Sequence, residues 1–164
     1  MIFEKNNRIR TKLFQSIEGL TDEQFNRTPS NGGWSPKQIF EHLVNMETMV
    51  ATNIAKELKN PNSPKSMSKP IALITNRLLK VDAPVSTAPT ETYKSKLEMQ
   101  NALYESHLFL LDVYESCSKE VLRSKSCKHP VFGQVPLSQW LPLVGLHEKR
   151  HLKQLREVIE MGQE

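Results

Sequence analysis

The chain has 164 residues, a length that suits one compact domain over residues 1–164, and its composition is 38% hydrophobic and 24% charged. No apolar run approaches the roughly 18 residues that a membrane-spanning helix needs, so no membrane partner is expected. The net charge is only +4 and the 22 Lys and Arg residues are spread along the chain, which argues against nucleic acid as a partner.

The first predicted helix covers about residues 2–20, where apolar side chains recur at helical spacing. Thr21 and Gln24 then match a capping box, in which each side chain binds the other residue's backbone N–H. This pair predicts a single helical turn before the break over residues 29–33.

The second helix has the clearest start in the sequence. Ser35 is available as N-cap, Pro36 fits the first helical position because its missing N–H costs nothing there, and Gln38 can close the capping box. One face of this helix carries Ile39, Leu43, Met46, Met49, Val50, Asn53 and Ile54. His42 falls on the same face, where a single histidine is more often a hydrogen-bonded core residue than a metal ligand.

Residues 60–89 are rich in proline and serine and predict a long crossover, with a short helix over 71–79 in its middle. A connection of this length lets the third helix, over about 92–118, run parallel to the second. The buried stripe expected on the third helix is Leu97, Tyr104, His107, Leu108, Leu111 and Tyr114. Within that stripe, His107 could face a site or lie at the boundary with one edge in solvent.

Residues 124–136 predict a loop in which His129-Pro-Val-Phe-Gly133 could form a short hairpin. The last helix follows, with Pro142 in its first turn and a half, where a missing N–H is least damaging. Its apolar stripe is Trp140, Leu141, Val144, Leu152, Leu155, Val158 and Ile159.

His147 and His151 lie four residues apart in this last helix, so both side chains project from one face and could bind one metal ion. Glu148 completes His-Glu-x-x-His, the zinc protease motif in which the glutamate acts as general base. The extended form of that motif needs Gly and His where this chain has Gln154 and Glu157. A zincin-type protease is therefore only a remote alternative.

Four amphipathic helices and hardly a strand predict an all-α fold, a four-helix bundle with a long crossover between helices two and three. Inward faces of different helices meet in such a bundle. His42, His147 and His151 all occupy inward positions, so together they predict one metal site, although each signal is weak alone.

Several motifs along the chain also carry a family resemblance. They are Gly33-Trp34-Ser35-Pro36, His42-Leu43, the loop Pro130-Val-Phe-Gly133, and His147-x-x-x-His151 followed by Gln154. Through them nearly the whole chain resembles the DinB-like superfamily of metal-binding four-helix bundles, which includes the YfiT-type proteins and the bacillithiol transferases. The resemblance implies a single DinB-like domain whose metal triad is His42, His147 and His151, but it does not imply a definite reaction.

Three neutral imidazoles leave a divalent metal with its full charge and at least one open position, as in catalytic zinc sites. Such a metal lowers the pKa of a bound water towards about 7, or holds a thiol as its thiolate. Zinc or nickel is the first choice of cofactor, and iron and manganese are also compatible with histidine ligands.

The expected function is therefore that of a metal-dependent enzyme. It would transfer a low-molecular-weight thiol to an electrophile or hydrolyse a small substrate. The alternative is a non-catalytic helical module that a metal stabilises, and a homodimer stays open in either case. Whether His107, Glu148 or Gln154 contributes to the site is also open.

The N-terminal residues have neither the long apolar core nor the cleavage site of a secretory signal, so we expect a cytoplasmic protein. Cys117 and Cys127 form no Cys-x-x-Cys motif and are predicted to be reduced and unbridged. Both should be dispensable, because a metal-bound thiol would supply the nucleophile.

Overall fold

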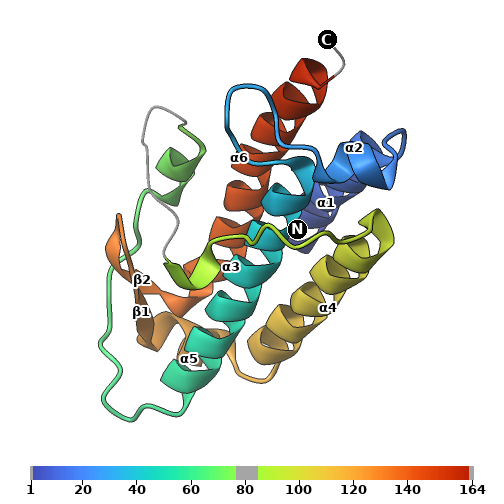
Figure 1. The fold of residues 1–164 in the computed structure, drawn as a ribbon. Coiled ribbons are helices and arrows are strands. Elements are labelled where there is room, and N and C mark those ends of the chain that lie inside the picture. Colours follow the sequence, from blue (N-terminus) through green and yellow to red (C-terminus); the bar gives the residue numbers. More distant parts are fainter. Residues whose placement is uncertain (1, 77–84, 163–164) are drawn as a thin grey trace.

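The structure, a computed structural model, describes residues 2–76 and 85–162. The helices in these residues are α1 (Ile2–Ile17), α2 (Asp22–Asn26), α3 (Pro36–Leu58), α4 (Lys96–Glu115), α5 (Lys119–Ser124) and α6 (Trp140–Met161). Three 3₁₀ turns, η1 (Ile71–Thr75), η2 (Val85–Thr87) and η3 (Leu137–Gln139), accompany strands β1 (Ser126–His129) and β2 (Gly133–Pro136). The four long helices α1, α3, α4 and α6 form the bundle, and the long connection joins α3 to α4 (Figure 1). The predicted all-α four-helix bundle is confirmed.

Local sequence explains where the helices begin. The capping boxes expected at Thr21 and at Ser35 are both present, at the starts of α2 and α3. Ser95 caps α4 in the same way, so this helix begins at Lys96 rather than near residue 92. Each box satisfies two backbone N–H groups that a helix would otherwise leave without a partner.

The helices pack in pairs, α1 against α6 and α3 against α4, and α3 also contacts α6. Helices α1 and α6 approach each other closely at Gly145, where an added Cβ would lie 1.9 Å from Asn6 Oδ1. The Asn6 amide also donates a hydrogen bond to the Leu141 carbonyl over 3.0 Å. A side chain at position 145 would therefore collide with the Asn6 side chain and disturb its hydrogen bond to Leu141.

Two apolar clusters fill the core, and a polar layer separates them along α3 and α6. The first cluster includes Val50, Ile54, Leu137 and Leu141. The second, towards the other end of the bundle, includes Ile39, Leu43, Leu152 and Leu155. Between them lie the buried polar side chains of His42, Glu47, Glu148 and His151. Buried polar groups need partners, so this layer is where a functional site should be sought.

The stripe expected on the third helix is partly wrong. Leu97, Tyr104 and Leu108 are 65%, 57% and 43% exposed. The buried positions of α4 are Met99, Leu103, Ser106, His107, Leu110 and Val113. Apolar residues occur on both faces of this helix, so periodicity could not decide which face meets α3.

Other connections also differ from expectation. The short helix expected over 71–79 is the 3₁₀ turn η1, and positions 77–79 lie outside the described residues. Helix α5 was not expected, but the short hairpin is confirmed, with register Cys127↔Val135 and His129↔Gly133. Figure 1 shows the hairpin and α4 on opposite sides of the α3–α6 pair.

Cys117 and Cys127 are both free thiols, as predicted. Among the helices of the described residues, none combines the length and the apolarity that a membrane crossing requires.

Candidate metal centre

The three predicted ligands come together in the polar layer. The His147 Nε2 atom lies 3.4 Å from His42 Nε2 and 3.1 Å from His151 Nε2. One ligand atom from each histidine lies within 4.8 Å of the others, and no other such group occurs in the part of the chain that the structure describes. Nitrogen ligands 2.0–2.1 Å from a tetrahedral zinc ion lie about 3.3 Å apart, so the cluster fits one divalent ion.

The opposite edges of two of these rings are fixed. His42 Nδ1 lies 2.9 Å from the Thr87 carbonyl oxygen, which can only accept, so Nδ1 carries the proton and Nε2 presents its lone pair. His151 Nδ1 lies 2.8 Å from Gln154 Oε1, so this Nδ1 also carries the proton and the Nε2 atom of His151 also presents its lone pair. Metal-binding histidines are commonly oriented by such partners. Gln154 thus supports the cluster through His151.

Thr87 belongs to the crossover, and nearby residues bind that segment to α3. The Glu41 carboxylate accepts hydrogen bonds from the Thr90 N–H at 2.9 Å and from the Thr90 hydroxyl at 3.0 Å. Lys37 Nζ lies 2.9 Å from the same carboxylate. The long crossover is therefore part of the site, because it holds the carbonyl that orients His42.

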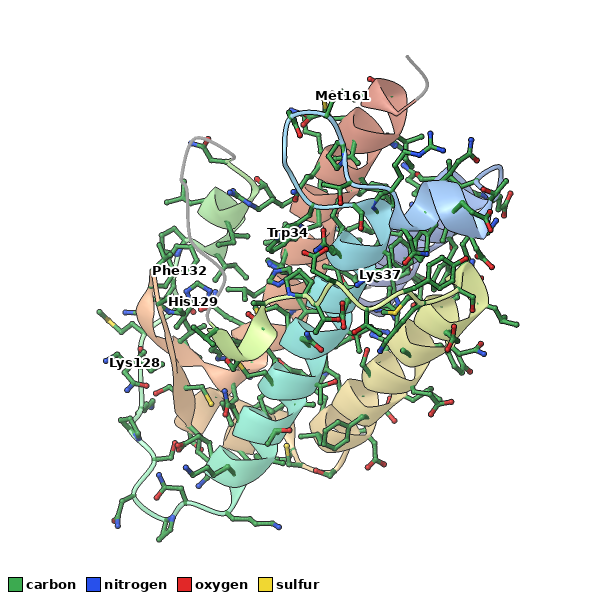
Figure 2. The ribbon with its side chains drawn as sticks, viewed as in Figure 1. Trp34, Lys37, Lys128, His129, Phe132 and Met161 are labelled. Atoms are coloured by element: carbon green, nitrogen blue, oxygen red, sulfur yellow. The ribbon has the colours of Figure 1, made fainter. Side chains whose placement is uncertain are left out.

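The Trp34 ring packs against two histidines of the cluster, and Figure 2 shows Trp34 beside α3 and α6. Its ring centroid lies 4.9 Å from that of His42 and 6.3 Å from that of His151, and it stacks on the latter at 17°. Trp34 directly precedes the cap residue Ser35, so the helix start places this ring.

Burial also sets the charge of the cluster. It lowers the pKa of His42 and holds the pKa of His147 well below its usual value, with positive charge on His151, His42 and Arg150 adding to the effect on His147. The rings of His42 and His147 are therefore neutral at neutral pH, which is the state that binds a metal.

A second buried cluster surrounds Arg10. Its guanidinium donates to Glu148 Oε1 at 2.5 Å and to the Glu47 carboxylate at 3.3 Å. Glu47 also accepts from the Ser106 hydroxyl at 2.7 Å and lies 2.6 Å from His107 Nδ1. This Arg10 cluster joins α1, α3, α4 and α6.

The contacts of Glu148 and His107 decide their roles. Glu148 pairs with Arg10 rather than facing the histidine cluster, and burial raises its pKa to about 8. Arg10 holds the Glu148 carboxyl outside the histidine cluster, and a general base must lie within hydrogen-bond reach of the group it deprotonates, so the geometry gives no support to the zincin alternative. His107 neither joins the histidine cluster nor reaches solvent at one edge, because it is buried against Glu47.

The histidines do not line the pocket of about 300 Å³ that opens at the other end of α6. That pocket lies between the α2 region and the end of α6, and residues such as Leu20, Arg27, Val158 and Met161 line it. Figure 2 places Met161 at that end of the molecule. No group in its lining matches the chemistry of the histidine cluster.

A family model described as the DinB superfamily matches residues 6–155. The chain belongs to the DinB superfamily. The predicted resemblance is thereby confirmed, and the matched residues include all three histidines of the cluster.

Two relatives and one solved structure illustrate this DinB membership. The uncharacterized protein YuaE of Bacillus subtilis (strain 168) is 28% identical over 154 residues, which are 94% of each chain. A Bacillus mycoides (strain KBAB4) protein, named as a candidate metal-dependent hydrolase, is 25% identical over 151 residues, covering 89% of this chain and 78% of its own. The structure of YfiT from Bacillus subtilis, described as a candidate metal-dependent hydrolase with an unusual four-helix bundle topology, matches with a TM-score of 0.64 at 17% identity. That match covers 96% of this chain and 83% of YfiT and shows the fold alone.

Sequence patterns did not reveal Arg10, Glu47 or the Thr87 carbonyl as parts of the polar layer. Arg10 lies 37 residues from Glu47 and 138 from Glu148, so no local motif joins them. For Arg10 and Glu47, the available signal was a charged residue at a position that the helical period places on the buried face.

Proposed function

We propose that this protein is a metal-dependent hydrolase of small substrates, with His42, His147 and His151 holding one divalent metal ion. The observation that carries the proposal is the convergence of three Nε2 atoms, two of them on rings whose Nδ1 atoms are already engaged. The Bacillus mycoides relative and YfiT, both described as candidate metal-dependent hydrolases, support the same reaction class. A divalent metal bound there supplies Lewis acidity, which lowers the pKa of water and polarises a substrate oxygen.

The protein residues would prepare this site rather than react in it. The Thr87 carbonyl and Gln154 hold the two rings in orientation, and Trp34 covers them against bulk water. The protein thiols are poor nucleophiles, because burial raises the pKa of Cys127 to about 12 and also raises that of Cys117. The raised pKa values of both cysteines are consistent with a nucleophile that comes from solution, such as water, rather than from a cysteine of the protein.

The decisive experiment uses protein prepared without a polyhistidine tag and loaded with zinc, nickel, iron or manganese in turn. Hydrolysis of chromogenic esters and amides should exceed the metal-free rate with at least one metal, and His147→Ala should abolish the difference. The matched control is His107→Gln, which alters a buried histidine outside the triad and should retain activity. Equal rates of hydrolysis for metal-loaded, metal-free and His147→Ala protein would refute the proposed hydrolase activity.

Transfer of a small thiol to an electrophile is the second candidate, since an accessible three-histidine metal can also hold a thiolate. The same loaded preparations would be assayed with a panel of small thiols and one chromogenic electrophile. Acceleration there without ester or amide hydrolysis would select transfer over hydrolysis.

The role of Glu148 separates both candidates from a protease. Glu148→Gln should retain metal and lose far less activity than the 10²- to 10⁴-fold that removal of a general base costs. A collapse of activity with the metal retained would revive the zincin mechanism.

A further inference from the structure

His129, the last residue of β1, has an imidazole whose tautomer is fixed by the turn that follows. Its Nδ1 atom accepts hydrogen bonds from the backbone N–H of Val131 at 3.1 Å and of Phe132 at 3.3 Å. In a neutral ring with Nδ1 as acceptor, the proton lies on Nε2. The side chain is only 6% exposed. The hairpin therefore holds a buried ring with its donor atom directed away from the turn.

The donor atom has no partner among the described residues. Both hydrogen bonds from the turn to the His129 imidazole use Nδ1, yet Nε2 is not among the fully enclosed polar atoms that lack a partner. The Nε2–H group therefore opens onto accessible space. An N–H donor on a buried ring is available to a bound molecule at little cost in reorganisation.

The ring of His129 lies along the same face of α6 as the triad. Its centroid is 5.0 Å from that of Phe132 and 5.7 Å from that of Trp140, and Figure 2 shows His129 and Phe132 together at the end of the hairpin. Trp140 precedes His147 by seven residues, so the two share a helix face about 10 Å apart. His129 also contributes to the lowered pKa of His147, which agrees with this proximity.

We propose that His129 contacts the substrate, with its Nε2–H donating a hydrogen bond to a carbonyl or carboxylate oxygen of a small molecule held at the triad. The inference rests on the proposed metal centre and deepens it, because it names the kind of group that the substrate presents. A neutral ring suits this position beside a divalent ion, since an imidazolium would repel it, and burial lowers the pKa of His129. Arg150 contributes positive potential at His147, which further favours an oxygen-rich or anionic ligand.

Two substitutions separate the donor from the structural role of the ring. His129→Asn keeps an oxygen near the position of Nδ1 that can accept from Val131 and Phe132, but it has no donor near the position of Nε2. His129→Gln does the reverse, because its amide can place an N–H near Nε2 but leaves the two backbone groups without their acceptor. Each variant therefore removes one function of the ring and keeps the other.

The probe is acetohydroxamate, titrated into cobalt-loaded protein and followed by the visible absorption of the cobalt ion. His129→Asn should bind the probe about tenfold more weakly or worse, with cobalt affinity and melting temperature unchanged. His129→Gln should bind the probe within about threefold of wild type while its melting temperature falls.

Equal probe affinity for His129→Asn and wild type would overturn the proposed role of His129 and would not affect the proposed hydrolase function. A loss of cobalt affinity in His129→Asn would also overturn it, because the residue would then position the metal site. Failure of the wild-type protein to bind acetohydroxamate would overturn it as well, and the hydrolysis assay would still judge the proposed function independently.

Discussion

Three histidines of the polar layer are distinguished by the partner of the Nδ1 atom. His42 and His151 place Nδ1 against the Thr87 carbonyl and the Gln154 amide oxygen, and their Nε2 atoms meet at His147. His107 places the same atom against the Glu47 carboxylate, outside the triad. Spacing in the sequence predicted His147 and His151, and an inward helix position predicted His42, whereas the role of His107 stayed open until the fold placed it against Glu47.

Substitution of the ligands should show that they act as one site. His42→Ala should weaken zinc binding as severely as His147→Ala, although the two positions lie 105 residues apart in the sequence. Isothermal titration with zinc would measure both, with His107→Gln as the matched control. Zinc affinity that survives His42→Ala but not His147→Ala would show that the triad is wrong.

The buried carboxyl of Glu148 should make the stability of the metal-free protein depend on pH. Burial raises its pKa from 4.5 in the unfolded chain to about 8, so its contribution to stability is complete below 4.5 and is lost as the pH rises through 8. The pKa values of His42, His129 and His147 are lowered by burial, so those rings are neutral in both states above their usual value of 6.5.

Accordingly, the free energy of unfolding should fall between about pH 6.5 and 9 in wild-type protein and stay level in Glu148→Gln. Urea denaturation with a chelator present would measure it. The same slope in both proteins would contradict a raised pKa for Glu148.

At the scale of elements, α6 packs closely against α1 at Gly145, and this contact is testable. Gly145→Ala should cost about 1–3 kcal/mol, because the new methyl group would overlap Asn6 Oδ1. Gly19→Ala is the control, since nothing lies within 4 Å of the Cβ that it adds. Urea denaturation of both would measure the difference, and adding Asn6→Ala to Gly145→Ala should relieve the overlap. Equal stability of the two single variants would argue against close packing at this point.

The Arg10 cluster joins four helices at the same level. Arg10→Met should destabilise the protein by about 3–5 kcal/mol, because it leaves the buried carboxyl groups of Glu47 and Glu148 without the guanidinium that binds them. The double variant Arg10→Met/Glu148→Met should recover much of this loss, since well-packed apolar groups can replace a buried ion pair. Denaturation at pH 7 would compare them. No recovery in the double variant would mean that Arg10 acts mainly through Glu47 or the Leu103 carbonyl.

Element boundaries were predictable where a local motif determines them, as at Thr21 and Ser35. The buried face of α4 was not, since Leu97 and Tyr104 on one side and Leu103 and Leu110 on the other are all apolar. Tertiary packing chose between the two faces, and single-sequence periodicity contains no information on that choice.

For the whole molecule, the pattern of four amphipathic helices was enough to predict the bundle, and the inward faces predicted that His42, His147 and His151 converge. The supports of the triad could not be predicted in the same way. The Thr87 carbonyl is a backbone group of the crossover and Trp34 precedes its helix, so neither belongs to a helical period. Only the folded chain brings them to the histidines.

Metal binding should stabilise the entire domain, because the ligands join α3 to α6. Free zinc at one hundred times its dissociation constant should add about 2.7 kcal/mol to the free energy of unfolding. For a chain of this size that corresponds to a rise of roughly 5–10 °C in melting temperature. Calorimetry with and without zinc would measure the rise, and His147→Ala should show none. An equal rise in His147→Ala would place the bound zinc elsewhere.

Helix α6 presents neighbouring residues, His147 and Glu148, to two different buried clusters. A residue inserted or deleted between Trp140 and His147 would rotate everything after it by about 100° relative to the start of the helix. A deletion would turn the Glu148 carboxyl towards His42, whereas an insertion would turn the His147 imidazole towards Arg10. Changes of chain length in natural variants or engineered forms should therefore be confined to the connections between helices, and this stretch should tolerate substitution far better than insertion.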